Sequence, residues 1–171
     1  MKSLKKFIRD VPDFPKKGVI FKDITTLLKE GKVFKETINL LAEKLRKKKI
    51  DKIVSMEARG FIFGGALAYK LGCGFVPVRK KNKLPWKKIN VTYELEYGTD
   101  TLEIHQDAIT KGENILIVDD VLATGGTVKS VVELVEKLGG RVIACTFLIE
   151  LAFLHGRDKL KKYKIYYLMK Y

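Results

Sequence analysis

The segment ILIVDDVLATGGT (residues 115–127) places two adjacent acids, Asp119 and Asp120, between four branched apolar residues and a Thr-Gly-Gly-Thr turn. The apolar run is too short to cross a membrane and too rich in β-branched residues for the middle of a helix, so it predicts a buried strand over residues 115–118. An apolar stripe that ends at Gly139-Gly140 predicts a helix over residues 128–138. We therefore expect the two acids at the carboxyl end of a strand.

Strands alternate with helices along the rest of the chain. The patterns predict further strands at residues 50–56, 75–78 and 141–151, and helices at 31–48 and from Gly60 through 66–72. Such alternation is typical of an α/β fold in which a mostly parallel central sheet is flanked by helices on both faces. Residues 91–108 differ, because apolar and polar residues alternate on either side of Gly98-Thr99-Asp100, which predicts a β-hairpin.

Length and composition are typical of a single globular domain spanning residues 1–171. The chain is 46% hydrophobic and contains no internal repeat, no linker-like tract and no apolar run of about 20 residues, so we expect a cytoplasmic protein without a membrane partner. Cys73 and Cys145 have no metal-ligand or paired spacing. The net charge of +14 favours polyanionic partners in general. We interpret the basic runs 44–52 and 156–164 as solvated helix faces or ends.

The chemistry of residues 119–127 favours a sugar phosphate as ligand. A glycine-rich turn before a helix lets backbone N–H groups converge on an anion at the positive end of the helix. Carboxylates beside such a site would be repelled by a phosphate but accept hydrogen bonds well from vicinal sugar hydroxyls. The pair Gly31-Lys32 is followed by Val33, so there is no Walker A sequence, and there is no G-x-G-x-x-G motif. The segment therefore fits a ribose 5-phosphate.

Residues 115–127 resemble the phosphoribosyl-diphosphate (PRPP) motif of the type I phosphoribosyltransferase family. The resemblance continues in order through residues 11–25, 56–64, 76–85, 93–109 and 148–151, and the blocks FPKKGVIFKDI, RKKNKLP and LEYG resemble the adenine-specific members. It implies the type I phosphoribosyltransferase fold, with residues 1–30 as a small N-terminal hood and 79–105 as a flexible active-site loop. It also implies a homodimer and a Mg²⁺-dependent reaction of purine salvage, in which adenine and PRPP give AMP and diphosphate.

The resemblance assigns the two anionic ends of PRPP to two separate loops. Asp119 and Asp120 bind the ribose hydroxyls, and the 5-phosphate lies on Ala123, Thr124, Gly125, Gly126 and Thr127. The diphosphate lies on Glu57, Ala58, Arg59 and Gly60, whose backbone and guanidinium can hold an anion. In this fold the loop often carries a cis peptide, here Glu57-Ala58. Mg²⁺ is bound mainly through PRPP and water, so no residue is assigned as a metal ligand.

The resemblance places catalytic groups in the loop that follows residue 78. Arg79, Lys80 and Lys83 bind the departing diphosphate, because cations stabilise the negative charge that it gains. Glu96 and Tyr97 match residues that act near the reaction centre, where a carboxylate stabilises the ribose cation or accepts the adenine proton. Glu103 is a rival acid, and the sequence does not decide between the two. His105 and His155 have no triad or metal spacing.

Adenine is assigned to the N-terminal block and to the end of the last predicted strand. By resemblance, Ile20 and Lys22 contribute backbone contacts, Phe21 stacks on the purine, and Leu151 packs on its opposite face. Lys22 stands where many members have Arg, which weakens a side-chain ion pair but leaves the backbone contacts intact.

Two alternatives remain open from the sequence. A regulator with this fold would keep the motif as a PRPP sensor and use its positive charge to bind nucleic acid, but the chain lacks a recognisable nucleic-acid-binding motif and we expect no specific nucleic-acid partner. The same chemistry on hypoxanthine or xanthine is the second alternative, and the N-terminal block argues against it.

Overall fold

The structure is a computed structural model that describes residues 4–94 and 99–171. The chain divides into two compact units, residues 1–40 and 41–171. The first unit holds η1 (Leu4–Phe7), β1 (Arg9–Pro12), β2 (Ile20–Asp23), α1 (Thr25–Leu28) and most of α2 (Gly31–Leu45), which continues into the second. In it, β1 pairs with β2 in antiparallel register, and ion pairs join Arg9 to Asp23 and Lys22 to Asp10 across the two strands.

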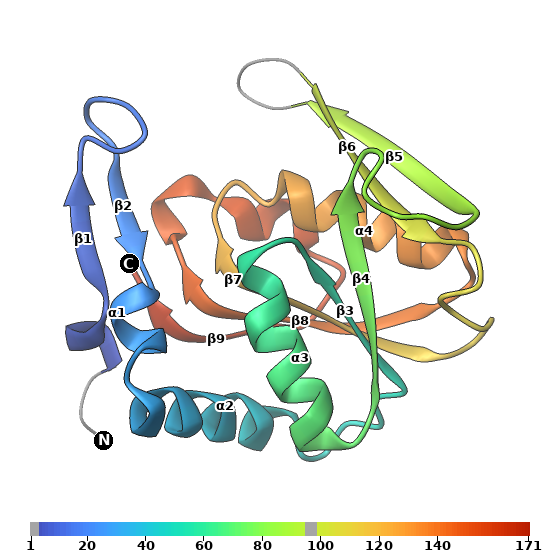
Figure 1. Cartoon of the computed structure of the whole chain (residues 1–171), viewed down its shortest axis with the longest axis horizontal. Helices are drawn as coiled ribbons and strands as arrows, with labels where there is room; N and C mark the ends of the chain where they lie inside the picture. Colours follow the sequence, from blue (N-terminus) through green and yellow to red (C-terminus); the bar gives the residue numbers. More distant parts are fainter. Residues whose placement is uncertain (1–3, 95–98) are drawn as a thin grey trace. The chain divides into compact units, whose positions relative to one another are not determined.

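The second unit is built on a seven-stranded sheet (Figure 1). Its strands are β3 (Lys52–Met56), β4 (Gly74–Lys80), β5 (Lys88–Glu94), β6 (Thr99–His105), β7 (Asn114–Leu122), β8 (Arg141–Glu150) and β9 (Ile165–Lys170), and their order is β5-β6-β4-β3-β7-β8-β9. The helical segments are α3 (Arg59–Leu71), α4 (Gly126–Lys137), η2 (Ala152–Leu154) and η3 (Gly156–Leu160). Five strands are parallel, and β5 and β6 form an antiparallel hairpin beside β4. The predicted mostly parallel sheet is confirmed.

The order of the strands explains why helices cover both faces of the sheet. The chain moves from β3 through α3 to β4 in one direction, and from β7 through α4 to β8 in the other. Because both crossovers are expected to be right-handed, α3 and α4 must lie on opposite faces, as Figure 1 shows. The reversal falls between β3 and β7, and ligands of such sheets bind at the carboxyl ends of the strands at that point.

Three boundaries differ from the prediction. The strand predicted to end at Val118 continues to Leu122, because β8 stays paired with it after its pairing with β3 has stopped at Ser55. Thr99 and Asp100 belong to β6, where they pair with Glu94 and Tyr93, rather than to the hairpin turn. The helix predicted to begin at Gly60 and to run through residues 66–72 begins at Arg59 and ends at Leu71. The strand β9 was not predicted at all.

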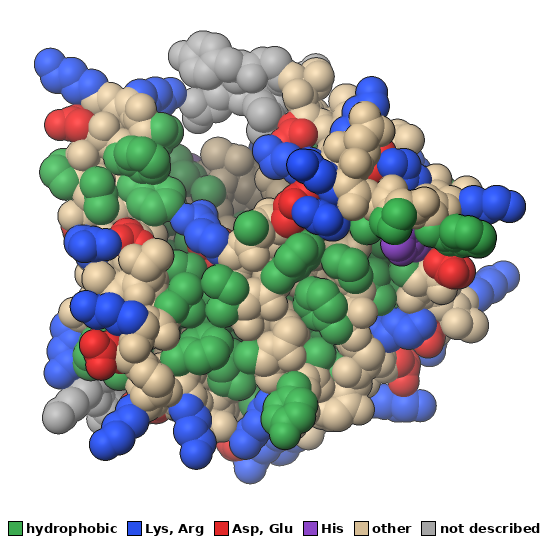
Figure 2. Space-filling view, in the orientation of Figure 1, with side chains coloured by type: hydrophobic (Ala, Val, Ile, Leu, Met, Phe, Trp, Pro, Cys, Tyr) green, Lys and Arg blue, Asp and Glu red, His purple; other side chains and the backbone are tan. Residues whose placement is uncertain are grey.

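No helix within residues 4–94 and 99–171 is both long and apolar enough to cross a bilayer. Figure 2 shows the basic side chains of one face spread over several elements and interspersed with acidic ones.

Helix α3 packs unusually close to the sheet at Gly64. A Cβ atom on Gly64 would lie 2.7 Å from Cβ of Ser55 and 2.9 Å from the ring of Phe75. By contrast, a Cβ atom on Gly65, the next residue of the same helix, would meet nothing within 4 Å. The absence of a side chain at residue 64 thus sets the distance between α3 and β3.

The substitution Gly64→Ala is expected to destabilise the protein by about 1–3 kcal/mol, because α3 must move away from Ser55 to admit the methyl group. Gly65→Ala is the matched control and should stabilise the protein by about 1 kcal/mol, through the higher helix propensity of alanine alone. Chemical denaturation of both variants measures this difference. Equal effects of the two substitutions would contradict the close packing.

Candidate active site

A pocket of about 250 Å³ lies at the carboxyl ends of β3 and β7, where the sheet reverses its direction. Its lining includes seven residues that the sequence predicted for the site, namely Glu57, Ala58, Arg59, Lys80, Asp119, Asp120 and Thr127. Tyr93, Asp100 and Leu102 of the β5–β6 hairpin also line it and were not predicted. The structure therefore brings residues 57–59, the two acids and Thr127 to one cavity, whereas Gly60 and residues 123–126 do not line it.

The two acids form the floor of this pocket. Asp120 is buried and makes an ion pair with Arg59, with Nε of Arg59 2.9 Å from Oδ2 of Asp120. Oδ1 of Asp119 accepts a hydrogen bond from the backbone N–H of Asp120. Burial and the neighbouring charge of Asp120 raise the pKa of Asp119 well above its ordinary value, and burial raises the pKa of Asp120, although Arg59 opposes that shift. Burial therefore disfavours the negative charge of both acids in the free site.

Gly60 allows α3 to begin directly beside Asp119. A Cβ atom on Gly60 would lie 2.7 Å from Oδ1 of Asp119 and 2.9 Å from Oγ of Ser55. The hydroxyl of Ser55 donates a hydrogen bond of 2.6 Å to the carbonyl of Val118, which ties β3 to β7 at the same level. The amino end of α3 is therefore held next to the acids.

Glu57 organises the loop between β3 and α3. The Glu57-Ala58 peptide is cis, as expected. The carboxylate of Glu57 accepts hydrogen bonds from the guanidinium of Arg79 and the backbone N–H of Lys80. Burial alone would raise the pKa of Glu57, but these two donors outweigh it, so the pKa is lowered and the group is ionised. Arg79 also donates to the carbonyl of Lys83, and neither residue lines the pocket.

The hairpin closes one side of the pocket and separates the two candidate acids. Lys80 makes an ion pair of 3.0 Å with Asp100 at the pocket wall. Glu103 is buried outside the pocket, where it pairs with Lys88 at 2.9 Å and accepts a hydrogen bond from the N–H of Asn82. Its position is that of a structural acid. Glu96 and Tyr97 lie outside the described residues.

The glycine turn before α4 packs against Gly156, the first residue of η3. Gly125 has a φ of +77°, and a Cβ atom on it would lie 2.4 Å from the carbonyl oxygen of Gly156. A Cβ atom on Gly156 would in turn lie 2.1 Å from the carbonyl oxygen of Ala123. The charged side chains of the run at 156–164 are exposed, as predicted, while Gly156 packs against the turn. The glycine at the start of this basic run was the sequence signal for its contact with the turn.

The residues assigned to adenine are distributed over the two units. Ile20, Phe21 and Lys22 form β2 in the first unit, where Ile20 is exposed and Lys22 pairs with Asp10 at 2.7 Å. Leu151 follows β8 in the second unit, and its N–H donates to the carbonyl of Leu122 at the end of β7. Their roles toward a base remain predictions.

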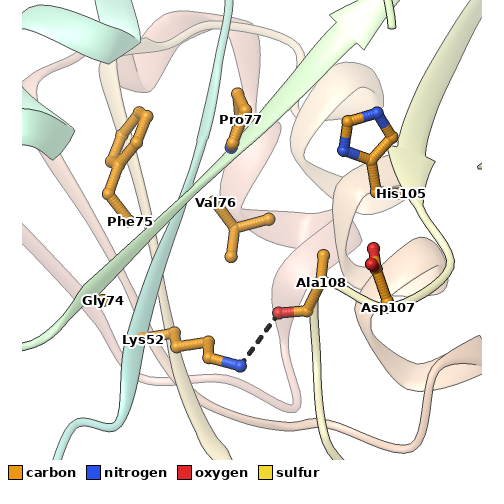
Figure 3. A pocket seen from close by; sticks show the side chains of 8 residues that line it. All are labelled: Lys52, Gly74, Phe75, Val76, Pro77, His105, Asp107 and Ala108. Atoms are coloured by element: carbon orange, nitrogen blue, oxygen red, sulfur yellow. Dashed lines mark hydrogen bonds between the residues drawn. The ribbon is translucent and has the colours of Figure 1, made fainter. Parts of the chain in front are cut away.

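A second cavity, also of about 250 Å³, lies at the amino ends of β3 and β4 (Figure 3). In Figure 3, Lys52 reaches toward Ala108 and donates a hydrogen bond of 3.0 Å to its carbonyl oxygen, while His105 lies across the cavity. None of the predicted site residues lines it. Because ligands of parallel sheets bind at the opposite, carboxyl ends, we do not assign the reaction to this cavity.

Comparison with known proteins decides the family. Residues 23–170 match the model of the phosphoribosyl transferase domain. The adenine phosphoribosyltransferase of Geotalea daltonii is 57% identical over 171 residues, which is 100% of both chains. The crystal structure of adenine phosphoribosyltransferase from Thermoanaerobacter pseudethanolicus is 56% identical, with a TM-score of 0.96 over 98% of each chain. The Saccharomyces cerevisiae enzyme, complexed with an imino-altritol bisphosphate and adenine, is 43% identical, with a TM-score of 0.91 over 96% of each chain.

The chain belongs to the adenine phosphoribosyltransferase family. As a phosphoribosyltransferase it is a glycosyltransferase that moves a pentosyl group, and the predicted type I fold is confirmed. Of the residues that the family motif marks for PRPP, Asp119, Asp120 and Thr127 line the pocket at the sheet reversal.

The substitution Asp119→Asn is expected to weaken PRPP binding about tenfold while stabilising the free protein by about 1 kcal/mol. The raised pKa means that the folded protein keeps a proton that the unfolded chain has lost, so wild-type stability falls as pH rises from about 3.8 through the folded pKa. Asparagine does not titrate, so its advantage should grow between pH 4 and pH 8. Melting temperatures across this range and the KM for PRPP measure the two effects.

Asp107→Asn is the matched control, because Asp107 is exposed and lines the other cavity. It should leave the KM for PRPP unchanged. An Asp119→Asn variant with lower stability at neutral pH would contradict the electrostatic account of the acids.

Proposed function

We propose that this protein transfers the 5-phosphoribosyl group of PRPP to N9 of adenine, forming AMP and diphosphate in purine salvage. The supporting observation is the 57% identity to an adenine phosphoribosyltransferase over the full length of both chains, which includes the N-terminal block as well as the PRPP motif. The pocket at the carboxyl ends of β3 and β7 agrees with this reaction, because its two acids and two helix amino ends match a sugar with two anionic substituents.

The acids are proposed to bind the ribose, and the turn before α4 its 5-phosphate. Asp119 and Asp120 offer four carboxylate oxygens to the 2′ and 3′ hydroxyls. The ion pair between Asp120 and Arg59 leaves Arg59 beside the sugar site, so a small movement of this exposed side chain lets it reach the diphosphate. Residues Ala123 to Thr127 supply backbone N–H groups and two hydroxyls for the phosphate.

Stabilisation of the leaving group is assigned to the loop at residues 57–60 and to the cations that follow β4. In the reaction the bond between C1′ and the diphosphate oxygen breaks, and its electron pair stays on the diphosphate. Arg79 and Lys80 are held close to this loop through the carboxylate of Glu57. Together with Lys83, they would lower the barrier by stabilising the charge that develops on diphosphate.

The new bond forms between the N9 lone pair and C1′, and the proton of adenine passes to a base. We assign this base, or the stabilisation of the ribose cation, to Glu96, with Tyr97 steering the leaving group. The contacts of Glu103 support this choice over its rival, because Lys88 and Asn82 already occupy the carboxylate of Glu103. Ile20, Phe21, Lys22 and Leu151 are proposed to hold the purine ring.

Mg²⁺ is proposed as the cofactor. Among residues 4–94 and 99–171 there is no group of three or more His, Cys, Asp or Glu side chains that could hold a metal. The pocket does contain the carboxylates of Asp119 and Asp120, and Mg²⁺ commonly binds one or two carboxylates, water and substrate phosphates. When bound with PRPP, the ion would neutralise charge on the diphosphate.

We further propose a cytoplasmic homodimer, as the family resemblance implies. Helix α3 exposes Ile62 and Tyr69, which are seven residues apart and therefore on the same side of the helix. Large exposed apolar side chains on one helix face support an interface with a second copy of the chain.

The proposed function predicts turnover with PRPP, Mg²⁺ and adenine, and little or none with hypoxanthine, guanine or xanthine. Glu96→Gln should lower kcat about 100-fold with little change in the KM for PRPP, since it removes a group that acts only in the transition state. Base consumption by the purified protein measures both. Absence of turnover with adenine would contradict the proposal, and a nucleic-acid shift without turnover would favour a regulator.

Glu103→Gln is the matched control. It should lower stability by about 1–3 kcal/mol, because Lys88 loses its charged partner, while kcat stays near the wild-type value in the folded protein. A large loss of kcat in the folded Glu103→Gln variant would transfer the catalytic role to Glu103.

A further inference from the structure

The connection from β8 to β9 supports the turn that is proposed to hold the 5-phosphate. Gly125 and Gly156 approach so closely that neither position has room for a Cβ atom. The contact is between backbones, so neither segment can move by a side-chain rotation to make space. The position of η3, and of the side chains on it, is thereby fixed relative to the amino end of α4.

Further contacts hold η3 in place on the other side. Arg157 makes two hydrogen bonds, of 2.7 and 2.9 Å, to the carboxylate of Glu150 at the end of β8. Its guanidinium also lies 5.5 Å from the ring centre of Tyr167 on β9. Leu160, at the end of η3, is buried in the hydrophobic core. This bidentate ion pair and the buried leucine make the short segment a rigid support.

Lys159 extends from this support toward the first residue of α4. Its Nζ lies 3.9 Å from the position that a Cβ atom on Gly126 would take. Two nearby acids are engaged elsewhere, because Asp158 pairs with Lys161 and Glu136 accepts a hydrogen bond from Tyr163, whereas Glu133 lines the same pocket as Lys159. Within the part of the chain that the structure describes, Lys159 takes part in no ion pair.

A lysine beside the amino end of α4 is electrostatically unfavourable unless an anion binds between them. The amino end of a helix carries partial positive charge, and a cation there is repelled by it. No side chain caps α4, so its first N–H groups are also without a side-chain acceptor. A phosphate group between the helix end and Lys159 would accept hydrogen bonds from the first N–H groups of α4 and neutralise the charge of Lys159. The site is too hydrophilic and exposed for an apolar ligand.

We propose that Lys159 is a side-chain ligand of the 5-phosphate of PRPP. This inference rests on the proposed function and extends it, because the 5-phosphate would otherwise be bound by backbone N–H groups and hydroxyls of residues 123–127 alone. The flexible stem and compact charge of lysine suit it to a phosphate dianion held at a helix end. Lys159 would thus select phosphorylated pentoses without touching the reacting carbon.

The test compares Lys159→Met with Lys162→Met, which removes the same charge from an exposed position three residues further along. Titration calorimetry measures the binding of ribose 5-phosphate and, separately, of inorganic diphosphate. Lys159→Met should bind ribose 5-phosphate about tenfold more weakly and raise the KM for PRPP by a similar factor, with diphosphate binding, the KM for adenine and kcat unchanged. Lys159→Arg should recover most of the loss.

The outcomes separate this inference from the proposed function. If wild-type protein turns over adenine and Lys159→Met binds ribose 5-phosphate as tightly as Lys162→Met does, the role of Lys159 is wrong and the function stands. Equal weakening of ribose 5-phosphate and diphosphate in Lys159→Met would also overturn it, because that pattern indicates a general electrostatic or structural effect. Lack of turnover by the wild type would instead contradict the function.

Discussion

The charge of Asp119 and Asp120 at the end of β7 is the constraint on which the rest of the site depends. Asp120 is buried, and bringing carboxylates out of water is costly unless donors and cations surround them. Arg59 and a backbone N–H offset only part of this cost, and α3 lies so close that Gly60 admits no side chain. The same packing brings the amino end of α3 to the pocket. The packing of α3 against β7 therefore positions the acids for a ribose and also forms the diphosphate loop.

Three cations at or beside the pocket are paired with acids before any substrate arrives. Arg59 pairs with Asp120, Arg79 with Glu57, and Lys80 with Asp100. For an incoming diphosphate to bind these cations, its oxygens must replace the protein carboxylates as their partners. Binding therefore reorganises existing ion pairs rather than filling a preformed positive site. Such pairing keeps the free enzyme's charges satisfied and favours ligands that bring both hydroxyl donors and anionic groups.

Local sequence patterns predict only some parts of this structure. The alternation of apolar runs indicates the parallel sheet, and the order acid-acid, glycine turn, helix places Asp119 and Asp120 at its carboxyl edge. The features that the sequence does not indicate depend on contacts between residues that are distant in the chain. β7 continues past Val118 because β8 pairs with it, Glu103 is structural because Lys88 meets it, and Gly156 matters because Gly125 lies against it. No local pattern contains these contacts.

The crystal structure of the protein with ribose 5-phosphate bound tests the central claim most directly, since it shows both halves of the PRPP site at once. The account predicts the phosphate at the amino end of α4 and the 2′ and 3′ hydroxyls about 2.5–3.0 Å from the carboxylates of Asp119 and Asp120. A phosphate bound instead at residues 57–60, with Arg59 still paired to Asp120 and the hydroxyls turned toward solvent, would contradict it.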